Sequence, residues 1–148
     1  MPKAQAALEY LLIIAMTFAI IIPTVYLFFT YSRESNIKII DFQISSIGRN
    51  IVNTAESIYY SGENSKTVLE FNMPEGVNNV LIISNKEVVF NVTTDFGYMD
   101  IVFFSDVNIT SNSCSGNICS LSPVATQGFQ KLRVRSISNG KQVLIEKE

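Results

Sequence analysis

Histidine and tryptophan are absent from the 148-residue sequence, and only two cysteines occur in it. Without histidine, the chain lacks the most versatile general base and a very common metal ligand. Two cysteines fall short of the four soft or imidazole ligands of a structural zinc site. The sequence also contains neither a Gly-x-Ser-x-Gly nucleophile motif nor a glycine-rich phosphate loop. We therefore expect a protein that is not an enzyme and that binds no metal and no cofactor.

Charge is sparse as well. The 11 basic and 13 acidic residues give a net charge of −2, and the basic residues are scattered along the chain. A nucleic-acid-binding surface needs clustered basic side chains that neutralise phosphates. The sequence therefore predicts no nucleic-acid partner. The ten phenylalanines and six tyrosines suit the filling of a hydrophobic core.

What the sequence does contain is a long apolar run near its N-terminus. No charged residue occurs from Tyr10 to Tyr31, and most of these residues are aliphatic or aromatic. The run exceeds the roughly 20 residues with which a helix crosses a bilayer core. Glu9 lies at its edge, where a carboxylate is costly unless it is paired or stays at the interface. We expect residues 5–32 to form a hydrophobic helix for a membrane or a filament core.

Helical patterning continues over residues 33–62. Apolar residues recur there at the spacing of an amphipathic helix, at Ile37, Ile40, Ile44, Ile47, Ile51, Ala55 and Ile58. Gly62 is a suitable C-terminal stop. One helix over residues 5–61 would be about 85 Å long. Pro23 removes one of its backbone hydrogen bonds and predicts a local kink.

The pattern changes to strands after residue 63. Alternating or β-branched segments predict strands at 67–71, 77–83, 88–92, 99–104, 132–134 and 143–145. Ser84-Asn85-Lys86 and Ser138-Asn139-Gly140-Lys141 predict hairpin turns, whereas residues 105–128 are rich in Ser, Asn and Gly and predict a long loop. We expect an α+β fold in which an antiparallel sheet of about six strands, over residues 63–148, packs on the isoleucine face of the helix.

The predicted loop contains both cysteines, in the segment Cys114-Ser-Gly-Asn-Ile-Cys119. A turn through Gly116 and Asn117 permits a disulfide, and two free thiols are the alternative. The choice depends on the redox compartment, and the apolar N-terminal run favours export and hence the disulfide.

Two segments match the N-glycosylation sequon. They are Asn91-Val-Thr93 and Asn108-Ile-Thr110. Such tripeptides are common by chance, so each alone is a weak signal. Two sequons in the half of the chain that also contains the cysteines favour an exported domain.

The N-terminal segment resembles a known signal. Gln5-Ala-Ala-Leu-Glu9-Tyr10, after a short basic leader at residues 1–4, resembles the class III signal peptide of archaeal type IV pilin-like proteins. The family pattern is Gln, any residue, Ser, any residue, Glu, and Tyr or Phe. This chain has Ala7 in place of the usual Ser, and Ala4 where Gly is more common. A long helix followed by an all-β domain is also similar to the pilin "lollipop" layout.

The resemblance implies how the chain is processed. A membrane-embedded, aspartate-dependent prepilin peptidase would cleave between Ala4 and Gln5 and leave the apolar segment on the mature protein. Gln5, Glu9 and Tyr10 would then serve peptidase recognition or assembly. The resemblance also implies that Glu9 meets the N-terminal amine of a neighbouring subunit. The alternative is that Glu9 is only the charged flank of a transmembrane anchor.

The resemblance also implies a function. The expected protein is a pilin, the structural subunit of an extracellular type IV pilus-like filament that serves surface adhesion. Its expected partners are further copies of itself, other pilin subunits, the prepilin peptidase, and the pilus assembly platform with its ATPase. Before assembly, the precursor would span the cell membrane once with the β domain outside.

Two alternatives stay open at this point. One is a single-pass membrane-anchored surface protein whose β domain binds a ligand or partner. The other is an archaellin-like subunit of a motility filament, although archaellins usually follow the cleavage site with a glycine-rich start that this chain lacks.

Overall fold

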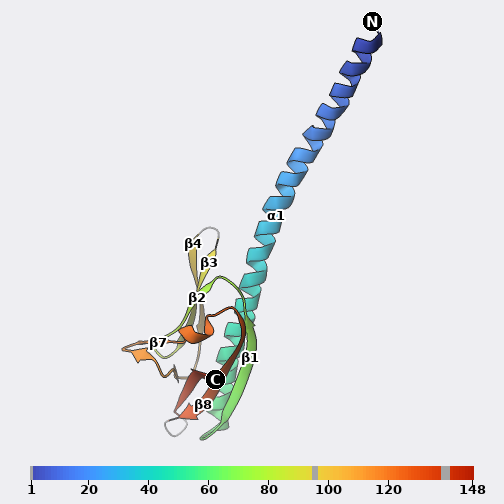
Figure 1. Ribbon diagram of the computed structural model, residues 1–148. Helices are drawn as coiled ribbons and strands as arrows, with labels where there is room; N and C mark the ends of the chain where they lie inside the picture. Colours follow the sequence, from blue (N-terminus) through green and yellow to red (C-terminus); the bar gives the residue numbers. More distant parts are fainter. Residues whose placement is uncertain (1, 95–96, 138–140) are drawn as a thin grey trace. The chain divides into compact units, whose positions relative to one another are not determined.

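The computed structural model describes the backbone of residues 2–94, 97–137 and 141–148. It describes the side chains of the same residues except 2–6, 33, 34, 36 and 37. The fold is α+β, as predicted, with one long helix, nine strands and a short 3-10 helix among the described residues (Figure 1). By its internal contacts the chain divides into two units, Met1–Ile39 and Ile40–Glu148.

Helix α1 spans Pro2–Ser61 and continues past Pro23 without interruption. It ends where the sequence predicts, since Gly62 follows with a φ of +89° and its N–H donates to the carbonyl of Tyr59 at 3.3 Å. A left-handed residue at this position is the usual helix stop, and glycine adopts it without steric cost.

The strands form two sheets, whereas the sequence predicted one. The four-stranded sheet has the order β1 (Lys66–Met73), β8 (Gly128–Ile137), β9 (Gln142–Lys147) and β5 (Ile109–Thr110). The five-stranded sheet has the order β4 (Gly97–Phe104), β3 (Glu87–Thr94), β2 (Val77–Ile83), β7 (Ile118–Ser120) and β6 (Cys114–Ser115). All pairs are antiparallel except β5 with β9, which is parallel.

The six longer strands are those that the sequence predicts. β2 has the predicted bounds, and the other five are two to seven residues longer than predicted. The predicted long loop at 105–128 is wrong, because β5, β6, β7 and the 3-10 helix η1 (Ser122–Val124) lie within it. Their strands have only 2, 2 and 3 residues, which is too short for alternation to be visible in the sequence. The antiparallel pairing of β8 with β9 fits the predicted second hairpin, although residues 138–140 of its turn lie outside the described residues.

The first predicted hairpin is confirmed, since β2 and β3 pair through the three-residue turn Ser84-Asn85-Lys86. Ser84 and Asn85 have φ values of +53° and +59°, and the N–H of Lys86 donates to the carbonyl of Ile83 at 3.1 Å. Two consecutive left-handed residues match the right-handed twist of the paired strands. This turn sets which side chains of β2 and β3 face outward.

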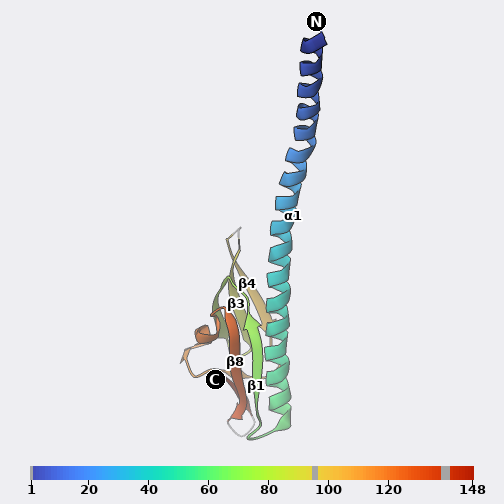
Figure 2. The same ribbon diagram turned by 45° about the vertical axis from the view of Figure 1, so that its right-hand side comes forward.

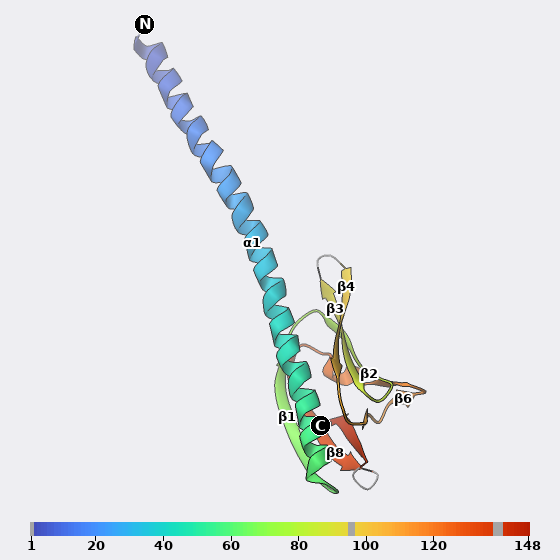
Figure 3. The same cartoon turned by 180° about the vertical axis from the view of Figure 1, so that it is seen from behind.

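The hydrophobic core lies between the sheets and the C-terminal part of α1, and this part runs alongside β1 in Figures 2 and 3. The predicted helix face is confirmed from Ile40 onward: Ile40 packs against the core, and the later members are buried, namely Ile44, Ile47, Ile51, Ala55 and Ile58. The side chain of Ile37 lies outside the described residues. The strands contribute buried side chains to the same core, among them Phe90, Val80, Leu132 and Ile145.

Candidate functional site

The N-terminal unit consists of helix with no core of its own. The 26-residue segment Ala7–Ser32 is long and apolar enough to cross a membrane, and none of it is buried by the rest of the chain. Its large apolar side chains point away from the axis on all sides and are all exposed. A helix that is apolar all round needs lipid or other helices around it. This segment is therefore the first candidate site.

The three threonine hydroxyls within this segment are satisfied inside the helix. The hydroxyls of Thr17, Thr24 and Thr30 donate to the carbonyls of Ile13, Ile20 and Tyr26, each four residues earlier, at 2.8, 2.8 and 3.1 Å. Threonine commonly makes this bond in helices, and lipid offers it no other partner. Apart from Glu9, Ser32 and the tyrosine hydroxyls, the segment thus presents an apolar surface to its surroundings.

The residues of the predicted signal lie in the first turns of α1. Glu9 and Tyr10 are both exposed, and within the described residues the Glu9 carboxylate has no ion-pair or hydrogen-bond partner. Ala4 and Gln5 belong to the helix by their backbone, whereas their side chains lie outside the described residues. Within the described residues, this carboxylate at the edge of an apolar helix is therefore left without a charge partner.

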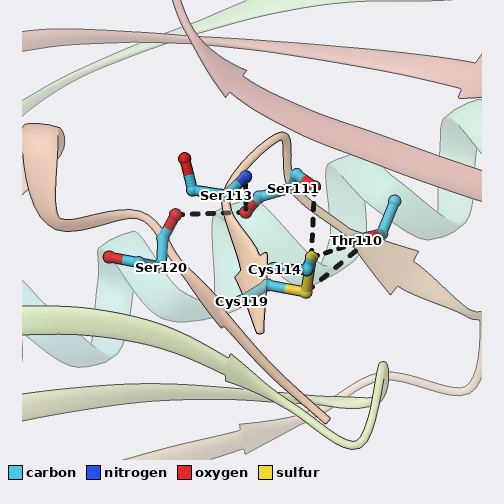
Figure 4. The surroundings of a disulfide bond; sticks show 6 residues. All are labelled: Thr110, Ser111, Ser113, Cys114, Cys119 and Ser120. Carbon is cyan, nitrogen blue, oxygen red and sulfur yellow. Dashed lines mark hydrogen bonds between the residues drawn. A yellow bond between two sulfur atoms is a disulfide. The ribbon is translucent and has the colours of Figure 1, made fainter. Parts of the chain in front are cut away.

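The two cysteines form the predicted disulfide (Figure 4). Cys114 and Cys119 lie directly opposite each other in the β6–β7 hairpin, with their Cα atoms 3.9 Å apart. Cys119 is only 1% exposed and belongs to the hydrophobic core. The hydroxyl oxygen of Thr110 lies 3.4 Å from the Cys114 sulfur and 3.8 Å from the Cys119 sulfur. The disulfide therefore joins the two very short strands of this edge hairpin, whose β7 strand pairs with β2.

A surface pocket of about 170 Å³ lies beside this hairpin. Its polar groups are already bonded within its wall: Asn112 donates to the Glu146 carboxylate at 2.7 Å, and the Ser111 hydroxyl donates to the Ser120 carbonyl at 3.1 Å. Within the described residues, no group of three or more Cys, Asp or Glu side chains is placed to hold a metal ion. The pocket wall is therefore a structural network with few polar groups left for a ligand.

The two sequons lie in different surroundings. Asn91 is in the middle of β3, and its side chain joins a row of polar residues. Its amide donates to the Asp100 carboxylate at 2.6 Å, and its carbonyl oxygen accepts from the Asn78 amide at 3.0 Å. Asn108 is exposed in the segment before β5, where its backbone carbonyl accepts from the N–H of Val143 at 2.9 Å. Its side chain makes no hydrogen bond to any residue that the structure describes, so it is the more accessible of the two.

Several aromatic residues lie at the surface, contrary to the expectation that they fill the core. Phe42, Phe104, Phe129 and Tyr60 in the second unit are all strongly exposed, whereas Phe90 and Phe103 pack edge to face within or against the core. For Phe104 and Phe129 the sequence gives no signal, because the facing of a strand residue depends on its pairing register. Phe42 and Tyr60 lie on α1 off its isoleucine face, so their exposure follows from the helical spacing. Surface aromatic residues are typical of interaction sites.

The fold and the site together define an α+β protein with an N-terminal helical segment fit to cross a membrane and a disulfide-containing β unit. No protein-family model matches the chain, and no curated protein or solved structure is significantly similar to it. The functional conclusion below therefore depends on this chain's own residues.

Proposed function

We propose that the protein is a pilin, the structural subunit of an extracellular type IV pilus-like filament that serves surface adhesion. The observation that carries the proposal is the segment Ala7–Ser32, which is apolar on every side and buried on none. Such a segment suits a bilayer before assembly and the centre of a helix bundle afterwards, because both surround it with apolar groups. The signal-like residues from Gln5 to Tyr10 precede it directly.

Processing follows from the same residues. Prepilin peptidase cleaves between Ala4 and Gln5, so that Gln5 becomes the first residue and Glu9 the fifth. Glu9 has no charge partner among the described residues. In the filament, the N-terminal amine of a neighbouring subunit supplies the positive charge that offsets the free-energy cost of burying its carboxylate. The other partners are the assembly platform and its ATPase, which extract the helix from the membrane.

The β unit forms the outer surface of the filament. The β6–β7 disulfide suits an oxidising extracellular location, and exposed Asn108 is an accessible acceptor for a glycan. The charged outward face of the four-stranded sheet, with ion pairs between Arg133 and Glu148 and between Lys131 and Glu70, suits contact with water.

The test is the N-terminal sequence of the mature protein in filaments sheared from the surface of cells that contain the peptidase. We expect the sequence to start at Gln5. The second candidate function is a permanently anchored surface protein, which the same membrane-spanning segment would also suit. Intact Met1 confined to the membrane fraction would overturn the pilin proposal and favour the anchor.

A further inference from the structure

The outward face of the five-stranded sheet carries an exposed apolar patch. Across adjacent strands, Phe104 lies opposite Glu87, and Glu87 lies opposite Ile83. Ile83 in turn lies opposite Ile118 of β7. We call this surface the sheet patch, and it consists of Leu81, Ile83, Glu87, Val102, Phe104 and Ile118. Phe104 is 71% exposed and Ile118 49% exposed. Contiguous exposed apolar residues of this kind mark an interaction surface.

One carboxylate stands among these apolar side chains. Glu87 is half-buried, and among the residues that the structure describes it has no ion-pair partner. Covering the sheet patch would therefore bury a lone negative charge, which is costly unless the covering surface brings a cation. The partner surface must be apolar in part and must contain one basic group opposite Glu87.

A surface of this kind exists on the same chain. The exposed side of α1 in the second unit presents a row of side chains at helical spacing, which we call the helix stripe: Phe42, Ser46, Arg49, Asn53 and Tyr60. Phe42 and Tyr60 are each 76% exposed. Arg49 lies between them, is exposed, and has no ion-pair partner in the described part of the chain.

The sheet patch crosses four adjacent strands, β4, β3, β2 and β7, and is about 14 Å wide at roughly 4.8 Å per strand. The helix stripe from Phe42 to Tyr60 is about 27 Å long at 1.5 Å per residue, so the patch covers the part of the stripe around Arg49. The helix stripe opposes the buried isoleucine face of α1, so docking leaves the core of each copy intact.

We propose that the helix stripe of one copy docks on the sheet patch of a second copy of this chain, with Arg49 of one paired to Glu87 of the other. The two surfaces differ, so every bound copy still offers one free surface of each kind. A contact of this type propagates into an open assembly unless the rotation closes it into a ring. This inference rests on the proposed function, because the assembly that results is the proposed filament. It adds the contact that joins the second units of two copies.

The test is a charge exchange in the full-length chain, produced in cells with prepilin peptidase and scored by the amount of filament in the sheared fraction. R49E and E87R each place like charges opposite each other, and we expect each to lower the filament yield about tenfold or more. The double variant R49E/E87R restores the opposite pair and should recover most of the yield. The control variants K141E and E75R change exposed charges outside both surfaces and should assemble normally.

A second readout keeps the contact testable if filaments do not form. Detergent-solubilised full-length R49C and E87C chains are mixed and oxidised, while the native cysteines stay bonded to each other. A mixed covalent dimer that appears only in the mixture supports the contact, and its absence overturns it. Normal yield from both single charge variants, or no recovery in the double variant, also overturns it. If the wild-type chain gives no filaments but the mixed dimer forms, the proposed function fails and the contact stands.

Discussion

The ring of Phe103 lies directly against the Cα of Gly48, in the space that a side chain at residue 48 would occupy. The contact joins α1 to β4, and Phe103 is held from its other side by an edge-to-face contact with Phe90 at 5.8 Å between ring centroids. Glycine is unfavourable within a helix, so its presence here has a packing reason. It allows the helix to approach the five-stranded sheet closely.

Gly48→Ala should therefore destabilise the second unit although alanine favours helix. We expect a loss of about 1–3 kcal/mol from overpacking, measured by thermal or denaturant unfolding of the full chain in detergent. The double variant Gly48→Ala/Phe103→Leu makes room for the new methyl group and should recover part of the loss. Ser46→Ala, on the exposed side of the same turn, is the control and should be neutral or slightly stabilising. Equal stability of Gly48→Ala and wild type would contradict the close contact.

Reduction of the Cys114–Cys119 disulfide should lower the free energy of unfolding by about 2 kcal/mol, because the bond closes a short loop and constrains the unfolded chain. The loss should be local at first, since the hairpin lies at a sheet edge and pairs with β2 through three residues only. Amide hydrogen exchange with and without a reducing agent would show faster exchange in residues 114–120. The variant Cys114→Ala/Cys119→Val should be insensitive to the reducing agent, and a reductant effect on this variant would point to another cause.

Lys131 provides a pH-dependent element on the outer face of the four-stranded sheet. A side-chain hydrogen bond with Glu70, and then the charge of Glu70, raise the pKa of Lys131 above its ordinary value of 10.5. The pair therefore contributes stability that is fully present below pH 10.5 and is lost as the pH rises through the raised pKa. The effect on stability should be small because Lys131 is exposed to solvent.

An NMR titration of the Lys131 ammonium group measures this pKa directly. Glu70→Gln should return the pKa toward its ordinary value, whereas Glu63→Gln, on an exposed residue away from the pair, should leave it unchanged. A Lys131 pKa that does not respond to Glu70→Gln would show that the ion pair does not form in solution.

The two sequon asparagines should respond differently to substitution. Asn91→Ala removes the hydrogen bonds to Asp100 and Asn78, and we expect a loss of about 1 kcal/mol in the free energy of unfolding. Asn108→Ala removes no side-chain hydrogen bond to the described part of the chain and should change stability by less than about 0.5 kcal/mol. Mass spectrometry of glycopeptides from the exporting cell should find the glycan at Asn108 at higher occupancy. The reverse occupancy would show that acceptor choice precedes folding of β3.

Glu9→Gln should leave cleavage intact and impair assembly. Its carboxylate has no partner within the described residues, so we expect its contribution to arise only when subunits meet. The filament yield should fall about tenfold for each 1.4 kcal/mol of interaction lost between subunits. Immunoblots of whole cells would show cleaved chain, while the sheared fraction contains little of it. Glu63→Gln is the matched control, and normal filaments from Glu9→Gln would refute the pairing.

Much of this fold is predictable from short-range patterns. The isoleucine spacing of α1, the stop at Gly62 and the six longer strands are all visible because each repeats over several residues. The division into two sheets is not visible, because it depends on which strands pair at long range. β1 pairs with β8 rather than with its neighbour β2, and no local residue pattern specifies this.

The candidate site is predictable to a similar degree. Glu9, the apolar segment and the cysteine pair can be read from the sequence because their signals are local. The exposed positions of Phe104 and Glu87 cannot, because they follow from the register of β4 against β3. Arg49 is visible as a residue off the isoleucine face, but its relation to a distant strand residue requires the three-dimensional structure.

The threonine hydroxyls of α1 have one more consequence. Thr17, Thr24 and Thr30 retain their hydrogen bonds to the helix backbone whatever surrounds the helix. These threonines can exchange lipid neighbours for helical neighbours without breaking or remaking a hydrogen bond. The free-energy difference between the two surroundings is then set by van der Waals packing and by the remaining polar groups, namely the Glu9 carboxylate and the hydroxyls of Ser32 and the tyrosines. The preferred surroundings therefore depend on how well the neighbouring helices fit.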